Sequence, residues 1–440
     1  MIHVDKSTRI PSVEETLGTL RYHNSMMPQF VDFDKVMMNI NYLNLCIHQY
    51  EGPLFEVIGK PKGVDASSNM KYWLTNNRQV DTSVFNWTKV GLSLDKESID
   101  SAINSGRLVE DIVSLLQVYQ KYSTYVRMRG TMVSLLQNPI SDAPSCDGHR
   151  MLIIKPTWHA QNTGRVAMRD PAVQNFNRLL QEVVTVPEGY VYCHTDSGQI
   201  EPRVVYSAFI KDTQIQSLIR LYNDAYFGVL HYISLPEGVH RSGVLQFDKM
   251  EITYEMKASR QSIKTHNNAV MYGSKSNVSG DPIKAKLIKY IGEHPLRIEW
   301  INRLEDEISK GSKIFYSAFG TPIDISNSKK LDPNAMKAHS INDELLKLAI
   351  NNPIQATAAD LMRLSVYEAN KIMMNKAKKS YIINYVHDAG SFAIHEDDYD
   401  KIADDLGDIV AYDVEGWLPI YAEPEFGRKN GEHGLFKDLY

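Results

Sequence analysis

Cysteine is scarce in this chain, and its few thiols lie far apart. The 440 residues include only Cys46, Cys146 and Cys193, with no Cys-x-x-Cys pair. This spacing excludes a disulfide framework and the usual zinc sites. Isolated thiols of this kind are typical of a reducing compartment, so we predict a cytoplasmic protein.

A long apolar segment is also missing. No apolar run approaches the roughly 20 residues that a membrane-spanning helix requires. The N-terminal residues 1–7 have neither the basic flank nor the apolar centre of a signal peptide. We therefore predict no membrane partner.

An excess of positive charge is absent as well. The 48 Lys and Arg residues are outnumbered by 53 Asp and Glu residues, which gives a formal net charge of −5. Net charge governs solubility and non-specific association, whereas a local cationic face is what binds phosphates. Composition thus leaves the function open, and the length allows about three folding units.

What is present is a long series of helical patterns. Apolar residues three or four positions apart, such as Val36, Ile40 and Leu43, predict a helix over 31–49. Further helices are predicted over 108–125, 213–232, 250–272, 284–308 and 345–378, the last interrupted near Pro353. A segment rich in Pro, Ser, Asp and Gly predicts a loop over 138–148.

Two aspartates each follow a predicted strand. One strand, 190–195, ends before Asp196, and another, 381–386, is followed by His387 and Asp388 in the turn of a predicted hairpin. Two-metal phosphoryl transfer needs carboxylates from separate strands, because the ions lie about 3.5–4 Å apart. A single aspartate here is more often a turn or capping residue, so the prediction depends on the pair.

A cationic stripe lies on the predicted helix between these aspartates. Arg260, Lys264, Asn268 and Tyr272 are spaced four residues apart, so they share one helix face. Two fixed cations can hold a triphosphate, and a terminal aromatic can stack on a base pair. The alternative is an ordinary solvated helix face.

Two further polar segments accompany the aspartates. Residues 163–175 precede the first aspartate and residues 351–360 precede the second. Their Arg, Asn and Gln side chains suit phosphates and minor-groove acceptors. Alone, they are also consistent with loop polars and a helix N-terminus.

In this order, the segments resemble the polymerase domain of family A DNA polymerases, the bacterial DNA polymerase I type, as a stand-alone and phage-like chain. The resemblance extends from about residue 30 to the C-terminus. Residues 196–203 share Asp, Gln, Ile, Glu and Arg with the family's Asp-Tyr-Ser-Gln-Ile-Glu-Leu-Arg element. The other elements that match are 121–125, 163–165, 174–175, 260–273, 351–360 and 387–388.

The resemblance implies an α+β, right-hand polymerase fold with an antiparallel-sheet palm and helical thumb and fingers. The implied divisions are an N-terminal extension over 1–29, thumb over 30–145, palm over 146–215, fingers over 216–335 and palm again over 336–440.

The implied activity is template-directed DNA synthesis, in replication or in repair, by nucleotidyl transfer from dNTPs to the 3′ end of a DNA primer. The implied cofactors are two Mg²⁺ ions, with Mn²⁺ as an alternative. Asp196 and Asp388 would be the catalytic metal ligands, together with the Ser197 carbonyl. Glu201 would be the steric gate against a ribose 2′-hydroxyl.

The resemblance also implies two sets of binding residues. The nucleotide would be bound by Gln199, Glu201, Arg260, Lys264, Asn268 and Tyr272. The primer-template DNA would be bound by Lys121, Ser123, Thr163, Arg165, Gln174, Asn175, Lys347, Asn351, Gln355 and His387.

The chain departs from the family pattern at several points. Ala389 replaces the Glu that normally follows the catalytic Asp, and Asn268 replaces an aromatic residue. The family's His ahead of the fingers helix has only Tyr226 as a weak counterpart. The thumb-like region begins near Phe30, so we expect no proofreading exonuclease and no 5′-nuclease in this chain. A separate exonuclease or processivity subunit is left open.

Two other functions remain as alternatives. A single-subunit RNA polymerase shares the palm, but Glu201 and Tyr272 argue against it. A non-catalytic primer-template-binding subunit would explain Ala389 and Asn268, whereas the two intact aspartates weigh against it.

Overall fold

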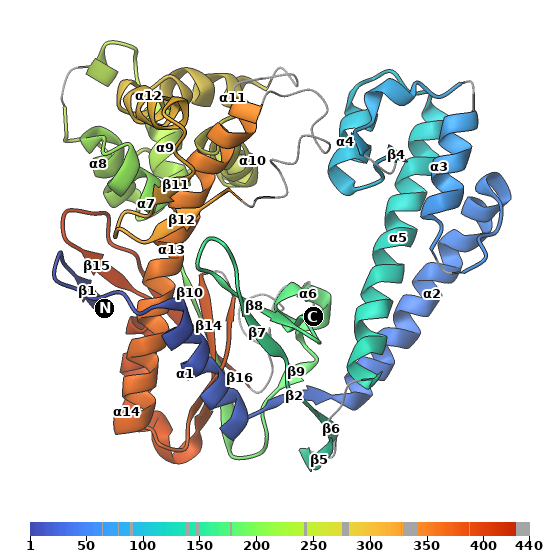
Figure 1. Ribbon diagram of the computed structural model, residues 1–440, viewed down its shortest axis with the longest axis horizontal. Coiled ribbons are helices and arrows are strands. Elements are labelled where there is room, and N and C mark those ends of the chain that lie inside the picture. Colours follow the sequence, from blue (N-terminus) through green and yellow to red (C-terminus); the bar gives the residue numbers. More distant parts are fainter. Residues whose placement is uncertain are drawn as a thin grey trace.

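The fold is built from three regions that Figure 1 shows as a U-shaped arrangement. A paired set of long helices stands on one side, a compact group of helices stands on the other, and sheets with covering helices join them below. The computed structural model describes residues 1–63, 65–77, 79–88, 91–137, 141–146, 149–176, 178–241, 244–274, 281–326, 328, 341–386 and 388–427. No helix in this described part combines the length and the apolarity that a bilayer crossing needs.

The region that the resemblance implies to be the thumb contains α2 (Phe33–Ile58) and α5 (Glu110–Gln137), which run side by side over most of their length (Figure 1). Asp32 begins α2 because its side chain accepts a hydrogen bond from the Lys35 amide at 3.0 Å. Buried residues of the two helices, Leu54 and Tyr122 among them, form one apolar cluster. The smaller thumb elements are α3 (Ser67–Asn76), β3 (Trp87–Thr88), β4 (Gly91–Leu92) and α4 (Lys96–Asn104).

The palm has an antiparallel four-stranded sheet in the order β13-β14-β10-β16. Its strands are β10 (Tyr190–Ser197), β13 (Tyr381–Val386), β14 (Ala389–His395) and β16 (Ala422–Gly427). The register sets Asp196 opposite Ala389 on β14 and opposite Glu423 on β16. The predicted hairpin is confirmed, and Asp388 lies in its turn.

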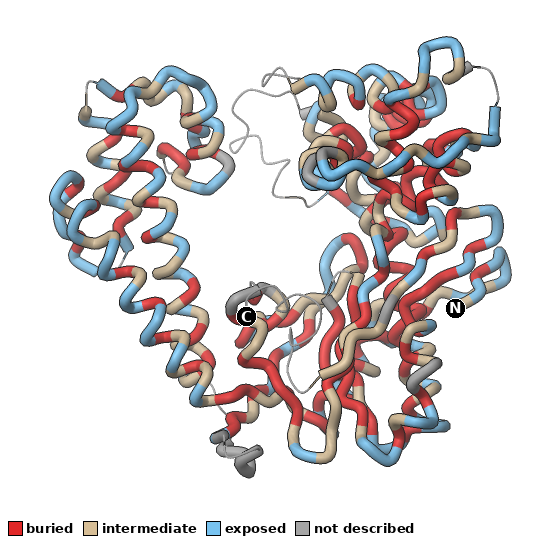
Figure 2. Tube along the Cα trace, turned by 180° about the vertical axis from the view of Figure 1, so that it is seen from behind, coloured by how far each residue is buried: buried red, intermediate tan, exposed pale blue. Residues whose placement is uncertain are grey.

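Three helices cover one face of this sheet, on the side away from α2 and α5 (Figure 1). They are α1 (Val13–Met26), α13 (Ile341–Asn375) and α14 (Glu396–Asp408). Their apolar residues form one cluster with Cys193 and Phe392 of the sheet, both fully buried. Figure 2 shows this concentration of buried backbone along the palm, with exposed residues on the outer surfaces. Strand β14 is buried on both faces over residues 389–394, so the central part of the sheet lies in the core.

The remaining palm strands form small sheets around the main one. Strands β5, β6, β2 and β9 pair in that order, while β7 pairs with β8 and β1 pairs in parallel with β15. Their bounds are β1 (Ile2–Val4), β2 (Gln29–Asp32), β5 (Ser141–Cys146), β6 (His149–Ile154), β7 (Thr157–Ala160), β8 (Val166–Arg169), β9 (Val184–Thr185) and β15 (Tyr412–Val414). Short helical turns lie at α6 (Arg178–Gln181) and α7 (Ile200–Val204).

The fingers are a separate helical group with an apolar cluster of their own. Buried Ile219, Val229 and Leu287 belong to this cluster. The fingers elements are α8 (Thr213–Tyr222), α9 (Ala225–Ser234), α10 (Tyr254–Met271), α11 (Pro282–Leu287), α12 (Pro295–Ser309), β11 (Ile314–Tyr316) and β12 (Pro322–Asp324).

Two local predictions from the sequence were wrong. Helix α13 continues through Pro353, although a proline removes one backbone donor and usually kinks a helix. Ile350 and Ile354 are buried on either side of it, so tertiary packing outweighs the local preference. The predicted loop over 138–148 contains strand β5, which pairs with β6. Residues 138–140 and 147–148 lie outside the described part.

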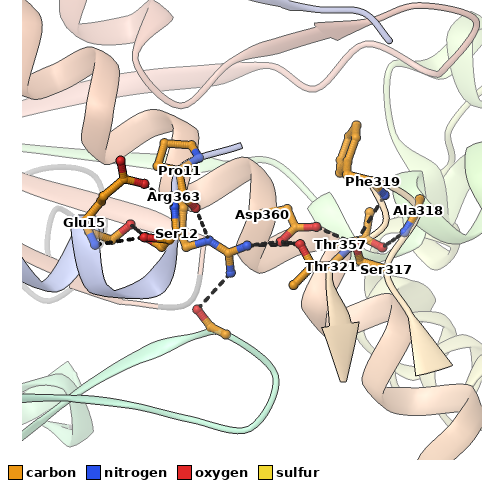
Figure 3. A network of polar contacts seen from close by, with 12 residues as sticks. Pro11, Ser12, Glu15, Ser317, Ala318, Phe319, Thr321, Thr357, Asp360 and Arg363 are labelled. Carbon is orange, nitrogen blue, oxygen red and sulfur yellow. Dashed lines mark hydrogen bonds and ion pairs between the residues drawn. The ribbon is translucent and has the colours of Figure 1, made fainter. Parts of the chain in front are cut away.

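A buried ion pair on α13 joins three parts of the chain (Figure 3). Arg363 pairs with Asp360, and these side chains are 4% and 0% exposed. The same guanidinium donates to the carbonyl oxygens of Pro11, at 2.8 Å, and of Gly164, at 3.3 Å. Asp360 also accepts a hydrogen bond from Thr321 of the β11–β12 hairpin at 2.9 Å. The pair therefore holds the N-terminal segment, the β7–β8 turn and the fingers hairpin against α13.

Glycine is required at the β7–β8 turn for two reasons. Gly164 has a φ of +75°, which other residues rarely adopt. A Cβ at this position would also collide with the Arg363 guanidinium. The close approach fixes the turn immediately before Arg165.

Candidate functional site

Two aspartates meet at the upper end of the palm sheet. Asp196 is the penultimate residue of β10, and Asp388 lies in the turn that connects β13 with β14. The Ser197 amide donates a hydrogen bond to the Asp388 carbonyl at 2.8 Å, which locks the turn to β10. The sheet register therefore positions both carboxylates, as the strand pattern predicts.

The two carboxylates repel each other. Burial, the negative charge of Asp388 and that of Glu425 together raise the pKa of Asp196 to about 7, and only the charge of Lys264 opposes this rise. Asp196 is exposed as a residue, yet enough protein surrounds its carboxyl to disfavour the ionised form. A cation placed between the aspartates would relieve this repulsion.

Asp196→Asn is expected to increase thermal stability at pH 8 in the absence of divalent metal. The folded-state pKa, about 7, lies above the usual value of 3.8. The contribution of Asp196 to stability is therefore most favourable at low pH and falls as the pH rises from 4 through 7. Because asparagine has no charge to lose, its advantage over wild type should be larger at pH 8 than at pH 5. Thermal unfolding in EDTA at both pH values measures this, and an equal difference at both would contradict it.

The donor set suits a hard cation that also contacts its substrate. Mg²⁺ is usually held by one or two carboxylates plus substrate phosphates, not by a complete protein cage. Within the described ranges, no group of three or more His, Cys, Asp or Glu side chains is arranged to hold an ion alone. Ala389, opposite Asp196, adds no ligand. The side chain of Ser197 points into the core, where it donates to the Val410 carbonyl at 2.7 Å.

A second cluster surrounds Glu201, which lies on α7, five residues after Asp196. Arg165 and the Tyr272 hydroxyl each donate a hydrogen bond to this carboxylate, one to each oxygen. Arg165 and Glu201 are 16% and 23% exposed. Burial, followed by the adjacent Glu201 charge, raises the pKa of Tyr272. The cluster joins the β7–β8 turn, α7 and the end of α10 around one carboxylate.

Residues of the predicted stripe on α10 approach Asp196 and Glu201. Lys264 is exposed and acts electrostatically on Asp196. Arg260 pairs with Asp224 at 2.7 Å. The Oδ1 atom of Asn268 is buried without a hydrogen-bond partner. Helix α10 thus presents cations toward the end of the palm sheet.

Other predicted residues are engaged within the protein. Thr163 is buried at the β7–β8 turn. The Gln174 amide accepts from the Met168 amide at 2.7 Å and donates to the Tyr385 carbonyl, so it ties β8 to β13. The side chain of Asn175 and the whole of His387 lie outside what the structure describes.

Helix α13 carries three predicted residues on one face. Lys347 pairs with Glu344 at 2.6 Å, and Asn351 has a buried side-chain oxygen without a partner. Gln355 follows one turn later and is half-buried. The spacing of four residues places them along one face of the helix.

The thumb residues lie apart from this site. Lys121 and Ser123 are on α5 and line a cavity of about 240 Å³ together with Tyr125 and Arg127. The Lys121 ammonium lies 5.7 Å from the centre of the Tyr50 ring. These residues form a separate cationic surface on the thumb.

Sequence reasoning missed two residues that organise the site. Asp224 pairs with Arg260, and Arg363 holds the turn before Arg165. An aspartate ahead of an apolar segment does signal a helix N-cap. Local sequence patterns could not reveal that Asp224 meets Arg260, 36 positions away, or that Arg363 meets Gly164, 199 positions away.

Comparison with known proteins gives a consistent family match. Residues 38–432 match the family model described as DNA polymerase family A. DNA polymerase I of Caldicellulosiruptor bescii is 23% identical over 392 residues, which cover 86% of this chain and 42% of that protein. Thermostable DNA polymerase I of Thermus thermophilus is 28% identical over 222 residues, which cover 47% of this chain and 24% of that protein. The chain therefore spans less than half of these relatives.

A solved structure shares the fold. The polymerase domain of Pol1 from M. smegmatis, in complex with DNA primer-template and dNTP, superposes with a TM-score of 0.74 and 18% identity. The match covers 96% of this chain and 70% of that one. The predicted α+β, right-hand fold with an antiparallel palm sheet and helical thumb and fingers is thereby confirmed.

Proposed function

This chain belongs to DNA polymerase family A, and from that premise we propose that it is a template-directed DNA polymerase that adds dNTPs to a primer 3′ end. The observation that carries the proposal is the convergence of three elements from separate segments. The Asp196–Asp388 pair, the Lys264 cation and the Glu201–Tyr272 contact all lie around one end of the palm sheet. The triphosphate of a bound nucleotide would lie near Lys264 and the metal-binding aspartates, and its sugar would lie near Glu201 and Tyr272.

Asp196, Asp388 and the Ser197 carbonyl would hold the metal, with Mg²⁺ preferred and Mn²⁺ as an alternative. Mutual repulsion of the carboxylates supports this assignment. When bound, two such ions activate the attacking hydroxyl and stabilise the leaving pyrophosphate. Lys264 and Arg260 would bind the triphosphate, while Tyr272 and Asn268 would face the sugar and base. Gln199 would line the same site.

The primer-template DNA would contact the thumb and α13. The thumb contribution would come from Lys121 and Ser123, and the α13 contribution from Lys347, Asn351 and Gln355. On the palm, we assign the same role to Thr163, Arg165, Gln174, Asn175 and His387. Binding should weaken with salt, because phosphate contacts release counterions.

We assign only polymerisation to these residues. A polymerase domain superposes on 96% of the chain, which supports the absence of a proofreading site within it. A primer with a mismatched 3′ end should therefore not be shortened. The domain boundaries, the cytoplasmic location and a separate exonuclease or processivity subunit remain predictions.

Templated primer extension tests the proposed function. With Mg²⁺ and a primed single-stranded template, only the dNTP complementary to the next template base should be added efficiently. Addition regardless of template, or preference for rNTPs, would contradict the proposal. Tight primer-template binding without any addition would favour the non-catalytic alternative.

Glu201→Ala is expected to relax discrimination against ribonucleotides. A carboxylate beneath the sugar leaves no room for a 2′-hydroxyl, and removal of such steric exclusion changes selectivity by about 10- to 200-fold. The ratio of kcat/KM for dNTP over rNTP measures this effect.

Glu201→Gln is the matched control, since it keeps the size of the side chain and can still contact Arg165 and Tyr272. We expect the glutamine variant to retain most of the discrimination. If alanine leaves the ratio unchanged, Glu201 is not the steric gate.

A further inference from the structure

Asp224 lies between the palm and the fingers and makes contacts in both directions. It is the N-cap of α9, where its Oδ1 accepts hydrogen bonds from the Tyr226 and Phe227 amides, both at 2.9 Å. Its Oδ2 accepts from Gln199 Nε2 at 2.7 Å and from Arg260 Nε and Nη2 at 3.2 and 2.7 Å. One oxygen thus caps the helix, and the other holds two predicted nucleotide-binding residues.

The environment keeps this carboxylate ionised. The Asp224 side chain is only 15% exposed. Burial alone would raise the pKa of Asp224, but the hydrogen bonds from Phe227, Arg260 and Gln199 outweigh it, so the pKa is lowered. A carboxylate that remains charged can hold a guanidinium at all ordinary pH values.

Arg260 is held on more than one side. Its guanidinium lies 5.3 Å from the centre of the Tyr226 ring and 5.9 Å from that of Phe227, within cation–π range. The Asp224 contact uses the Nε and Nη2 positions, so the Nη1 edge points away from the carboxylate. The positive N-terminal end of α9 would otherwise repel this cation. The orientation of Arg260 therefore depends on Asp224.

Gln199 connects this arrangement to the aspartate on β10. It lies three residues beyond Asp196, in a left-handed conformation with φ of 59°. Its Oε1 accepts from the Ala225 amide at 2.5 Å, in addition to the bond that it donates to Asp224. The start of α9 is thereby fixed relative to the metal-binding end of the palm.

We propose that Asp224 is a positioning residue for the incoming nucleotide, which orients the Arg260 guanidinium toward the triphosphate and fixes it relative to Gln199. This role rests on the proposed function, because Arg260 must be the triphosphate contact. Asp224 itself does not touch the nucleotide. A misplacement of about 1 Å in such a contact can cost 100-fold.

Asp224→Asn separates positioning from capping. Asparagine is as good an N-cap as aspartate, so α9 should stay folded. The NH2 group that replaces Oδ2 can accept neither the Arg260 nor the Gln199 hydrogen bond. We expect the Kd for the next correct dNTP to rise by about 10- to 100-fold. The measurement is equilibrium binding to a complex with a 3′-dideoxy-terminated primer, so it does not require catalysis. The Kd for primer-template DNA should not change.

Two comparisons sharpen the test. Asp212 is also a helix N-cap in the fingers, but it pairs with His294 at 3.2 Å, so Asp212→Asn should leave dNTP binding unchanged. In an Arg260→Ala background, Asp224→Asn should raise the Kd for dNTP much less than it does in wild type, because the Arg260 contact through which it mainly acts is already absent.

Each result leads to a decision. Unchanged or tighter dNTP binding by Asp224→Asn would overturn the positioning role, even where wild type extends primers. An additive effect in the Arg260→Ala background would also overturn it, since the role would then be structural. Failure of the wild-type protein to bind the correct dNTP would contradict both the positioning role of Asp224 and the proposed function. If the wild-type protein binds the correct dNTP but does not extend the primer, the proposed function alone would be contradicted.

Discussion

Asp388→Asn is expected to reduce dNTP incorporation by at least about a thousandfold, which corresponds to ~4 kcal/mol in the activation free energy. Asparagine keeps the shape of the turn, and the Asp388 carbonyl can still accept the Ser197 amide. What is lost is one of two carboxylates that would hold the metal. Ala389, the next residue in the chain, has no carboxylate that could take its place. Single-turnover incorporation by wild type and variant measures the loss.

The control for this prediction is Asp413→Asn. Asp413 is an exposed aspartate on β15 that pairs with the exposed His3 at 3.3 Å. Its substitution should leave incorporation unchanged, and both variants should bind primer-template DNA like wild type. A loss of tenfold or less for Asp388→Asn would show that this carboxylate is not essential.

Asp360→Ala is expected to destabilise the fold by about 3–5 kcal/mol, the usual cost of breaking a buried ion pair. The substitution leaves the Arg363 charge, only 4% exposed, without its carboxylate. It also removes the acceptor for Thr321, so the fingers hairpin loses a contact to α13. The change in the free energy of unfolding, measured by urea denaturation, tests this.

A matched pair on the same helix provides the comparison. Glu368 and Lys371 have the same spacing of three residues and pair at 2.9 Å, but Lys371 is 50% exposed. Glu368→Ala should therefore cost only about 0–1 kcal/mol. Similar losses for the two variants would show that burial does not make the Asp360–Arg363 pair important.

The sequence allowed a large part of the palm to be predicted. The strands before Asp196 and Asp388 were recognisable because alternating and β-branched residues precede each aspartate, and pairing of β10 with β14 then brings the two together. The α10 stripe was recognisable from its spacing of four. These features depend on local pattern, which sequence records directly.

Features that depend on distant partners could not be predicted. One example is the hydrogen bond that Gln174 donates to the Tyr385 carbonyl, because the two residues are 211 positions apart. The continuity of α13 through Pro353 depends on burial on both sides, and not on local propensity. The Asp224–Arg260 pair is of the same kind. Helix and strand patterns indicate which face a residue takes, but not which side chain it meets there.

The most direct test of the account is incorporation of one templated deoxynucleotide by the wild-type protein, with Mg²⁺ or with EDTA. The primer-template complex is formed first and confirmed by a binding measurement, so that a lack of incorporation cannot be due to a lack of DNA binding. We predict addition of the complementary dNTP with Mg²⁺ and none with EDTA. A bound primer that is not extended at any Mg²⁺ concentration, or is extended equally in EDTA, would contradict the role of the Asp196–Asp388 pair.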